Sequence, residues 1–252
     1  MTKSADRGGA SPPVDLLSIR QPEKGYRFSI DSVLLAGFAA RFCRESVLDL
    51  GTGCGVLLLL LSRLCDEMSF GAGVELQEEL FECARDNFLG NAPSDLLQAF
   101  HGDFREAPPG VIPESFGLVV SNPPYGRVGH GRSNPDSGKE AARREVFSSL
   151  DELFLAANFF MAPSGQFALI LPIERIREIE ACCRRVRMSM KVVRLVHARE
   201  GAPPSRILCC LSRESCGSTE ELAPLIIHGE KEKYSREVES ICRLFRSGVQ
   251  TF

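Results

Sequence analysis

The chain has 252 residues, of which 44% are hydrophobic and 25% are charged. These values are typical of a folded protein with a sizeable core and exclude global disorder. The formal net charge of −3 excludes binding to nucleic acid through overall positive charge, so such a partner would have to meet a local basic patch.

Strands and helices are predicted to alternate after a flexible leader at residues 1–15. The predicted strands cover residues 46–50, 70–76, 96–101, 116–121, 165–171, 191–197 and 206–212. The predicted helices cover residues 31–42, 56–65, 77–89, 150–161, 173–186 and 234–245, and residues 213–223 are expected to form a polar loop. This alternation indicates an α/β protein with a mainly parallel seven-stranded sheet covered on both faces, formed by a single domain over 16–252. The last two strands lack a clear helix between them, which indicates an antiparallel edge.

A glycine-rich turn follows the first predicted strand, in the stretch V47-L-D-L-G-T-G-C-G55. Gly51 and Gly53 would let the backbone turn tightly and approach a ligand closely. Asp49 lies two residues before the first glycine. Its negative charge suits a cofactor that carries a cation better than one that carries a pyrophosphate.

Two more acids follow the next two strands. Glu75 ends the second strand, before Leu76, and a carboxylate there can accept hydrogen bonds from both hydroxyls of a ribose. Asp103 follows the third strand and can accept from an adenine amino group, with Phe104 beside the ring. With Asp49, these acids fit S-adenosylmethionine. The alternative is that Glu75 and Asp103 are ordinary helix N-caps.

The fourth strand is followed by Asn122-Pro123-Pro124-Tyr125, at the point where a substrate would meet the cofactor. The side-chain oxygen of Asn122 and the carbonyl of Pro123 can accept the two N–H groups of a planar amine, which would expose the nitrogen lone pair to a methyl group. Tyr125 can stack on the planar group. No general base is needed before transfer, because the proton can leave afterwards. The alternative is a plain double-proline turn.

These motifs resemble those of class I methyltransferases, which have a Rossmann-like fold and act on planar amino nitrogens. The stretch Q21-P-E-K-G-Y-R-F-S-I-D-S-V-L-L-A36 is similar to bacterial tRNA adenine-N6 methyltransferases that modify the adenine beside the anticodon of valine tRNA. The loop at 122–137 and the ending from 225 to 235 also resemble that family, so the similarity covers about residues 16–252. The resemblance implies S-adenosylmethionine as the cofactor, tRNA as the partner and N6-methyladenine as the product.

The resemblance also implies roles for individual residues, with Asn122 to Tyr125 holding the target amine. The implied cofactor-binding residues are Tyr26, Phe28, Asp31, Asp49, Gly51, Gly53, Glu75, Leu76, Asp103, Phe104 and Asn122. From the residues alone, Asp31 could equally be a helix N-cap, and Tyr26 and Phe28 could be packing residues. His197 is interpreted as a polar residue at a strand end and not as a catalytic base.

Positive charge is concentrated in two segments. Residues 171–212 carry nine Lys or Arg residues against four acids, and the loop at 126–147 is rich in Gly and Arg. Phosphate contacts of such side chains would position an RNA without reading its sequence. We expect the loop to become ordered when RNA binds; the alternative for these charges is a solvated helix face. The RNA-binding residues expected in the loop are Arg127, Arg132, Lys139, Arg143 and Arg144.

The ten cysteines include no Cys-x-x-Cys pair, so we expect reduced thiols that pack in the core, and no bound metal. The N-terminus lacks the apolar core of a secretory signal, and the apolar run at 56–61 is too short to span a bilayer. A cytoplasmic protein without a membrane segment is therefore expected.

Four other functions share parts of this pattern. Protein glutamine methyltransferases share the Asn-Pro-Pro-Tyr motif, but only about 46 residues precede Val47, too few for their helical substrate domain. DNA adenine methyltransferases would need a target-recognition domain, for which the chain has no room. Ribosomal RNA adenine remains open as a substrate. A non-catalytic RNA- or nucleotide-binding module is disfavoured, because it has no physical reason to keep both Asp49 and Asn122.

Overall fold

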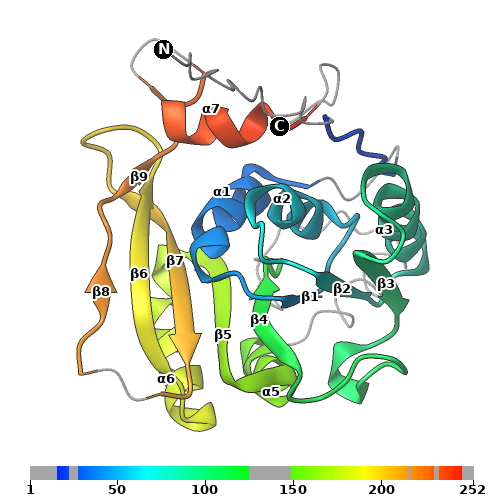
Figure 1. Ribbon diagram of the computed structural model, residues 1–252. Coiled ribbons are helices and arrows are strands. Elements are labelled where there is room, and N and C mark those ends of the chain that lie inside the picture. Colours follow the sequence, from blue (N-terminus) through cyan, green and yellow to red (C-terminus); the bar gives the residue numbers. More distant parts are fainter. Residues whose placement is uncertain (1–15, 23–27, 125–148, 215–216, 230–232, 246–252) are drawn as a thin grey trace, which may run out of the picture.

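A computed structural model describes residues 16–22, 28–124, 149–214, 217–229 and 233–245, in which the strands form one twisted sheet (Figure 1). The long strands are β1 (Ser46–Leu50), β2 (Phe70–Glu75), β3 (Leu97–His101), β4 (Phe116–Ser121), β5 (Met161–Pro172), β6 (Ser189–His197) and β7 (Pro204–Ser212). Two strands of two residues each, β8 (Glu220–Glu221) and β9 (Leu225–Ile226), pair with β6.

The order of strands in the sheet is β3-β2-β1-β4-β5-β7-β6-β8. Neighbours from β3 to β5 are parallel, and β7 runs antiparallel to both β5 and β6. The predicted α/β fold, with its mainly parallel sheet and antiparallel side, is confirmed. One detail is wrong, because β8 lies inside 213–223, which we expected to be a loop. A two-residue strand is too short to show an alternating hydrophobic pattern.

The helices cover both faces of the sheet. In Figure 1, α1, α2, α3 and α7 lie on one face, and α5 and α6 lie on the other. The bounds are α1 (Ile30–Ala39), α2 (Val56–Leu64), α3 (Glu78–Asn91), α5 (Leu150–Phe160), α6 (Ile176–Val186) and α7 (Arg236–Cys242), with 3-10 turns η1 (Ala40–Phe42), η2 (Phe104–Glu106) and η3 (Ile173–Arg175). None of the helices described is both long and apolar enough to cross a membrane.

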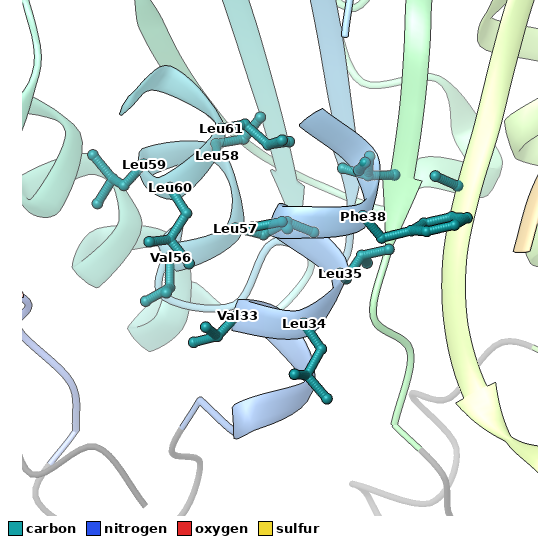
Figure 2. Packing of buried hydrophobic residues seen from close by; sticks show 14 of the residues in the cluster. Val33, Leu34, Leu35, Phe38, Val56, Leu57, Leu58, Leu59, Leu60 and Leu61 are labelled. Carbon is teal, nitrogen blue, oxygen red and sulfur yellow. The ribbon is translucent and has the colours of Figure 1, made fainter. Parts of the chain in front are cut away.

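Helices α1 and α2 form the centre of one core layer, because each is covered on more than one side. Leu34, Leu35 and Phe38 of α1 are almost fully buried, as are the five leucines at 57–61 of α2 (Figure 2). Helix α7 closes this layer from outside, and Leu17 donates its backbone N–H to Leu244 O at 2.7 Å just after α7. Because α1 is so densely packed, its first turn is held rigidly against the residues that it contacts.

The expectation that all cysteines are reduced thiols is wrong for one pair. Cys43 follows η1 and Cys65 ends α2, and the structure joins them in a disulfide with Cα atoms 6.2 Å apart. The pair lies at the edge of the sheet where β1 begins, and it closes a loop over β1 and α2. A separation of 22 residues matches no metal or redox motif, so the pairing depends on how α1 and α2 pack.

Reduction of this disulfide is expected to destabilise the protein. A closed loop of this length stabilises the folded state by about 3 kcal/mol through the entropy of the unfolded chain, so dithiothreitol should lower Tm by roughly 6 to 12 °C. Thermal unfolding with and without the reductant measures this. Cys43→Ser should remove the response to dithiothreitol, whereas Cys83→Ser, which changes a buried free thiol, should keep it. A wild-type Tm that is the same with and without dithiothreitol would contradict the prediction.

Candidate active site

The polar residues predicted from the ends of successive strands meet at one edge of the sheet. Strands β3, β2, β1 and β4 are parallel neighbours, so their carboxyl ends point the same way. Asp49 is the second-last residue of β1 and Glu75 is the last residue of β2. Asp103 follows β3, and Asn122 follows β4. In such sheets this edge is where ligands bind.

The glycine turn is held against β2 by backbone hydrogen bonds. The N–H groups of Gly51 and Thr52 both donate to Val74 O, each at 3.0 Å. The N–H of Gly53 donates to the Glu75 carboxylate at 2.9 Å, and Gly55 has φ +82° at the N-cap of α2. The turn therefore depends on the end of β2 and on a left-handed residue where α2 begins.

Gly55→Ala is expected to disrupt this turn. A Cβ at Gly55 would lie 2.5 Å from a ring carbon of Phe88, and φ +82° is strained for alanine, so we expect a loss of roughly 2 to 4 kcal/mol of stability. Thermal unfolding measures the loss. Gly90→Ala is the matched control, because a Cβ at Gly90 of α3 meets nothing within 4 Å, and it should leave Tm unchanged or raise it slightly. Equal Tm values for the two variants would contradict the packing argument.

Asp49 is buried, and only one of its two carboxylate oxygens has a hydrogen-bond partner among the residues described. Its Oδ2 accepts a hydrogen bond from the Thr52 hydroxyl at 2.7 Å, whereas its Oδ1 is buried and has no hydrogen-bond partner among the residues described. Burial raises the pKa of Asp49 to about 7; the Thr52 hydrogen bond lowers it and the nearby Glu75 carboxylate raises it further. A buried carboxylate oxygen of this kind is suited to a cationic group of a ligand.

Glu75 is buried, and its carboxylate holds both the glycine turn after β1 and the turn that leads into α3. Its two oxygens accept hydrogen bonds from Gly53 N and Gln77 N, both at 2.9 Å, and burial raises its pKa above the usual range of a glutamate. Leu76 follows it and is 36% exposed at the same edge. A carboxylate has lone pairs left for further donors such as ribose hydroxyls.

Asp103 has a partner that the sequence did not indicate. Its carboxylate accepts from the backbone N–H of Arg105 at 2.9 Å and from the Arg105 guanidinium, which also reaches Glu152. The hydrogen bonds from the Arg105 side chain hold the pKa of Asp103 below its usual value. Asp103 also caps η2, as the N-cap alternative requires, and Phe104 is partly buried against the core beneath.

Asn122 comes directly after β4 and is partly buried. Its side-chain Nδ2 donates to the hydroxyl of Ser32 at 3.0 Å, a contact between residues 90 positions apart. Pro123 is partly buried, and Pro124 is exposed beside the edge. Tyr125, predicted to stack on the target, lies outside the described residues.

The start of α1 also lies close to this edge. Ser29 caps the helix by accepting from Asp31 N, so the alternative that Asp31 is the N-cap is wrong. The Asp31 carboxylate is buried and forms an ion pair with Arg206 of β7 at 2.7 Å. Phe28 is buried and stacks on Phe245 with ring centroids 5.6 Å apart, the contact that the packing alternative requires. Tyr26 lies outside the described residues.

The basic segment at 171–212 does not form one patch. Helix α6 begins beside the carboxyl end of β5 and runs to the opposite edge, so its basic residues are divided between the two edges. Five of the nine basic residues form ion pairs: Arg175 with Glu178, Arg185 with Asp151, Lys191 with Glu214, Arg194 with Glu237 and Arg206 with Asp31. The residues predicted to bind RNA (Arg127, Arg132, Lys139, Arg143 and Arg144) lie outside the described residues.

Two other expectations concern chemistry at this edge. His197 ends β6, and its Nδ1 lies 2.6 Å from Ala202 O within the β6–β7 turn, which agrees with a polar residue at a strand end. In the described part of the chain, no group of three or more His, Cys, Asp or Glu side chains is placed to hold a metal ion. Three residues that contact the predicted site escaped sequence reasoning: Ser32, Arg105 and Arg206. Arg105 and Ser32 each stand next to a residue of a quoted motif, Phe104 and Asp31, whereas Arg206 was considered only as one of the basic residues of 171–212.

Known proteins with similar sequences and structures carry methyltransferase names. Residues 29–171 match the methyltransferase small domain family. The tRNA1(Val) (adenine(37)-N6)-methyltransferase of Pedobacter heparinus is 31% identical over 73% of this chain and 76% of its own, and that of Tolumonas auensis is 26% identical over 91% and 94%. A predicted O-methyltransferase from Agrobacterium tumefaciens shares the fold, with a TM-score of 0.65, 22% identity and coverage of 85% of this chain and 96% of its own.

Proposed function

Because this chain belongs to the methyltransferase small domain family, we propose that it methylates the exocyclic N6 of adenine in tRNA, at the adenine beside the anticodon of valine tRNA. Family membership makes the chain an S-adenosylmethionine-dependent methyltransferase. The relatives named for tRNA1(Val) match it over most of their length and suggest the tRNA substrate. The observation that carries the proposal is Asn122 at the carboxyl end of β4, the strand that pairs in parallel with β1, which carries Asp49.

The residues at this edge fit S-adenosylmethionine. Asp49 offers a buried oxygen without a partner among the described residues, which suits a cationic group, and Glu75 offers a carboxylate for hydroxyl groups. Asp103 would serve the adenine end, with Leu76 and Phe104 beside it. When bound, S-adenosylmethionine supplies an electrophilic methyl group on a sulfonium. The contribution of this chain is therefore to place a nucleophile in line with that methyl group.

An adenine amine is a weak nucleophile because its lone pair is delocalised into the ring. In this proposal, Asn122 and Pro123 make it more nucleophilic. The Asn122 Oδ1 and the Pro123 carbonyl accept the two N–H groups, which turns the nitrogen toward tetrahedral geometry and frees the lone pair. The rigid φ of proline fixes the direction of the carbonyl. Fixed acceptors of this kind stabilise the positive charge that develops on nitrogen during transfer, and the proton leaves afterwards.

Three further features belong to the same proposal. The contacts of Leu17 with Leu244 and Phe245 support one domain over residues 16–252. The basic residues of 126–147 would contact tRNA phosphates, and Tyr125 would stack on the extruded adenine. A tRNA-modifying enzyme of this kind would act in the cytoplasm.

Labelled S-adenosylmethionine tests the proposal directly. The purified protein would be incubated with unmodified total tRNA, with ribosomal RNA and with a release-factor protein that presents a glutamine. Label recovered as N6-methyladenosine from digested tRNA, and found in the valine tRNA fraction, is the expected result. Label on ribosomal RNA or on the protein, with none on tRNA, would overturn the tRNA assignment while keeping the methyltransferase.

A further inference from the structure

We propose that Asn87 of α3 is a positioning residue for cofactor binding, which couples the glycine turn to the N-terminal segment at 17–21, here called the strap. Its side-chain amide contacts Cys54 of the turn and Arg20 of the strap at the same time. The inference rests on the proposed function, in which the glycine turn lies against S-adenosylmethionine, but it does not depend on which RNA is methylated.

The three hydrogen bonds of this amide fix its orientation. Asn87 Oδ1 accepts from Arg20 N, and Asn87 Nδ2 donates to Arg20 O and to Cys54 O, each at 2.8 Å. All three partners are backbone groups, and a backbone N–H can only donate while a carbonyl can only accept. An amide rotated by half a turn would therefore bring oxygen against two carbonyls. Asn87 is only 2% exposed, so the loss of one of these hydrogen bonds would leave a buried polar group unpaired.

The strap lies beside α3 and pairs with two of its asparagines (Figure 1). The backbone N–H and carbonyl of Ser18 both bond to the Asn91 side chain, at 2.7 and 3.0 Å, as those of Arg20 do to Asn87. Residues two apart in an extended chain are about 6.6 Å apart, and four helical residues rise about 6 Å, so one asparagine on each turn of α3 can meet every second residue of the strap. The strap is thus held to α3 by two amides, and the Asn87 amide also contacts the glycine turn.

The glycine turn is therefore supported from two sides. Strand β2 holds its first half through the hydrogen bonds described above. From α3, Asn87 holds the carbonyl of Cys54, and the ring of Phe88 packs against Gly55. A turn that is held in place before the cofactor arrives loses less conformational entropy on binding. Because the strap shares the Asn87 amide with the turn, and coupling between two sites is reciprocal, occupation of the turn should also stabilise the strap on α3.

Calorimetric titration with S-adenosylmethionine tests this role. Asn87→Ala is expected to weaken binding roughly 10- to 30-fold, within the usual range of coupling between two sites. Asn91→Ala is the matched control, because each substitution removes three side-chain hydrogen bonds, but that of Asn91 removes none to the glycine turn. Both variants should melt at a lower temperature than the wild type, whereas the affinity of Asn91→Ala should stay within about threefold of it. Wild-type affinity in Asn87→Ala, or equal losses of affinity in the two variants, would overturn the proposal.

Hydrogen exchange in the strap gives a second readout, which begins with the wild type alone. In ¹⁵N-labelled protein, the backbone N–H of Arg20 should exchange with water at least about fivefold more slowly once S-adenosylmethionine is bound. This response should be kept in Asn91→Ala and lost in Asn87→Ala. An exchange rate that the cofactor leaves unchanged in the wild type would overturn the coupling, as would a response that persists in Asn87→Ala. Neither experiment contains RNA, so methylation of ribosomal RNA instead of tRNA would refute the proposed substrate and leave the coupling supported.

Discussion

Asn122→Ala is expected to lose methyl transfer by roughly 100- to 1,000-fold, the range seen when one fixed hydrogen-bonding group is removed from a catalytic site. The variant lacks the acceptor for the amine, so the nitrogen lone pair stays delocalised. Cofactor affinity should fall less than about tenfold, because Asp49 of β1, Glu75 of β2 and Asp103 after β3 stay in place. Rates of tRNA methylation and titration of S-adenosylmethionine by calorimetry measure the two quantities separately.

A second variant at this position separates the two ends of the amide. Asn122→Asp keeps an acceptor for the amine but removes the donor that reaches Ser32. It should be clearly more active than Asn122→Ala and less active than the wild type. If Asn122→Ala methylates tRNA at the wild-type rate, the amine is activated elsewhere. If it loses cofactor binding altogether, Asn122 belongs to the cofactor pocket first.

The arrangement of the acids could be predicted because parallel strands end at the same edge of a sheet, so residues that follow such strands in the sequence lie along one edge. Asp49, Glu75, Asp103 and Asn122 each stand at the end of a recognisable strand, and parallel pairing brings those ends to one edge. Nothing beyond the strand pattern was needed for this inference.

Contacts that cross between elements could not be predicted in the same way. Ser32 and Asn122 are 90 residues apart, and their contact depends on how α1 lies over the sheet, which local patterns do not encode. The Cys43–Cys65 disulfide has the same origin, since it forms only because α1 and α2 end side by side. The roles of such residues come from packing, and sequence periodicity carries no signal for them.

Burial of Asp49 lowers the stability of the protein without cofactor, but it also favours binding of a cationic ligand group. Burial raises the pKa of this carboxyl to about 7 in the folded protein, above its value of 3.8 in a solvated chain. The folded state therefore holds the proton more tightly. As the pH rises from about 4 to about 7 the protein progressively loses stability, because this carboxyl ionises in the unfolded chain while it is still largely protonated in the folded one. A cationic ligand group would relieve this penalty, because it pairs with the buried oxygen. Binding of the cofactor should thus raise stability most at neutral and higher pH.

Asp49→Asn is therefore expected to change binding and stability in opposite directions. Cofactor affinity should fall roughly 10- to 100-fold at pH 8, because a hydrogen bond to a charged group is lost. The empty variant should melt roughly 2 to 10 °C higher than the empty wild type at that pH, because asparagine can still accept from Thr52 but carries no buried charge.

The pH dependence supplies the control for this interpretation. In the wild type, cofactor affinity should rise between pH 6 and pH 8 as Asp49 ionises, whereas in Asp49→Asn it should be nearly flat across that range. Glu75 is the nearby carboxylate that raises the pKa of Asp49, so Glu75→Gln should shift the wild-type rise toward lower pH. Calorimetric titration at several pH values, with thermal unfolding of the empty proteins in the same buffers, gives both curves. The opposite result, an Asp49→Asn protein that is less stable without cofactor than the wild type at pH 8, would contradict this interpretation. It would mean that the Asp49 carboxylate stabilises the glycine turn and does not serve to bind a cation.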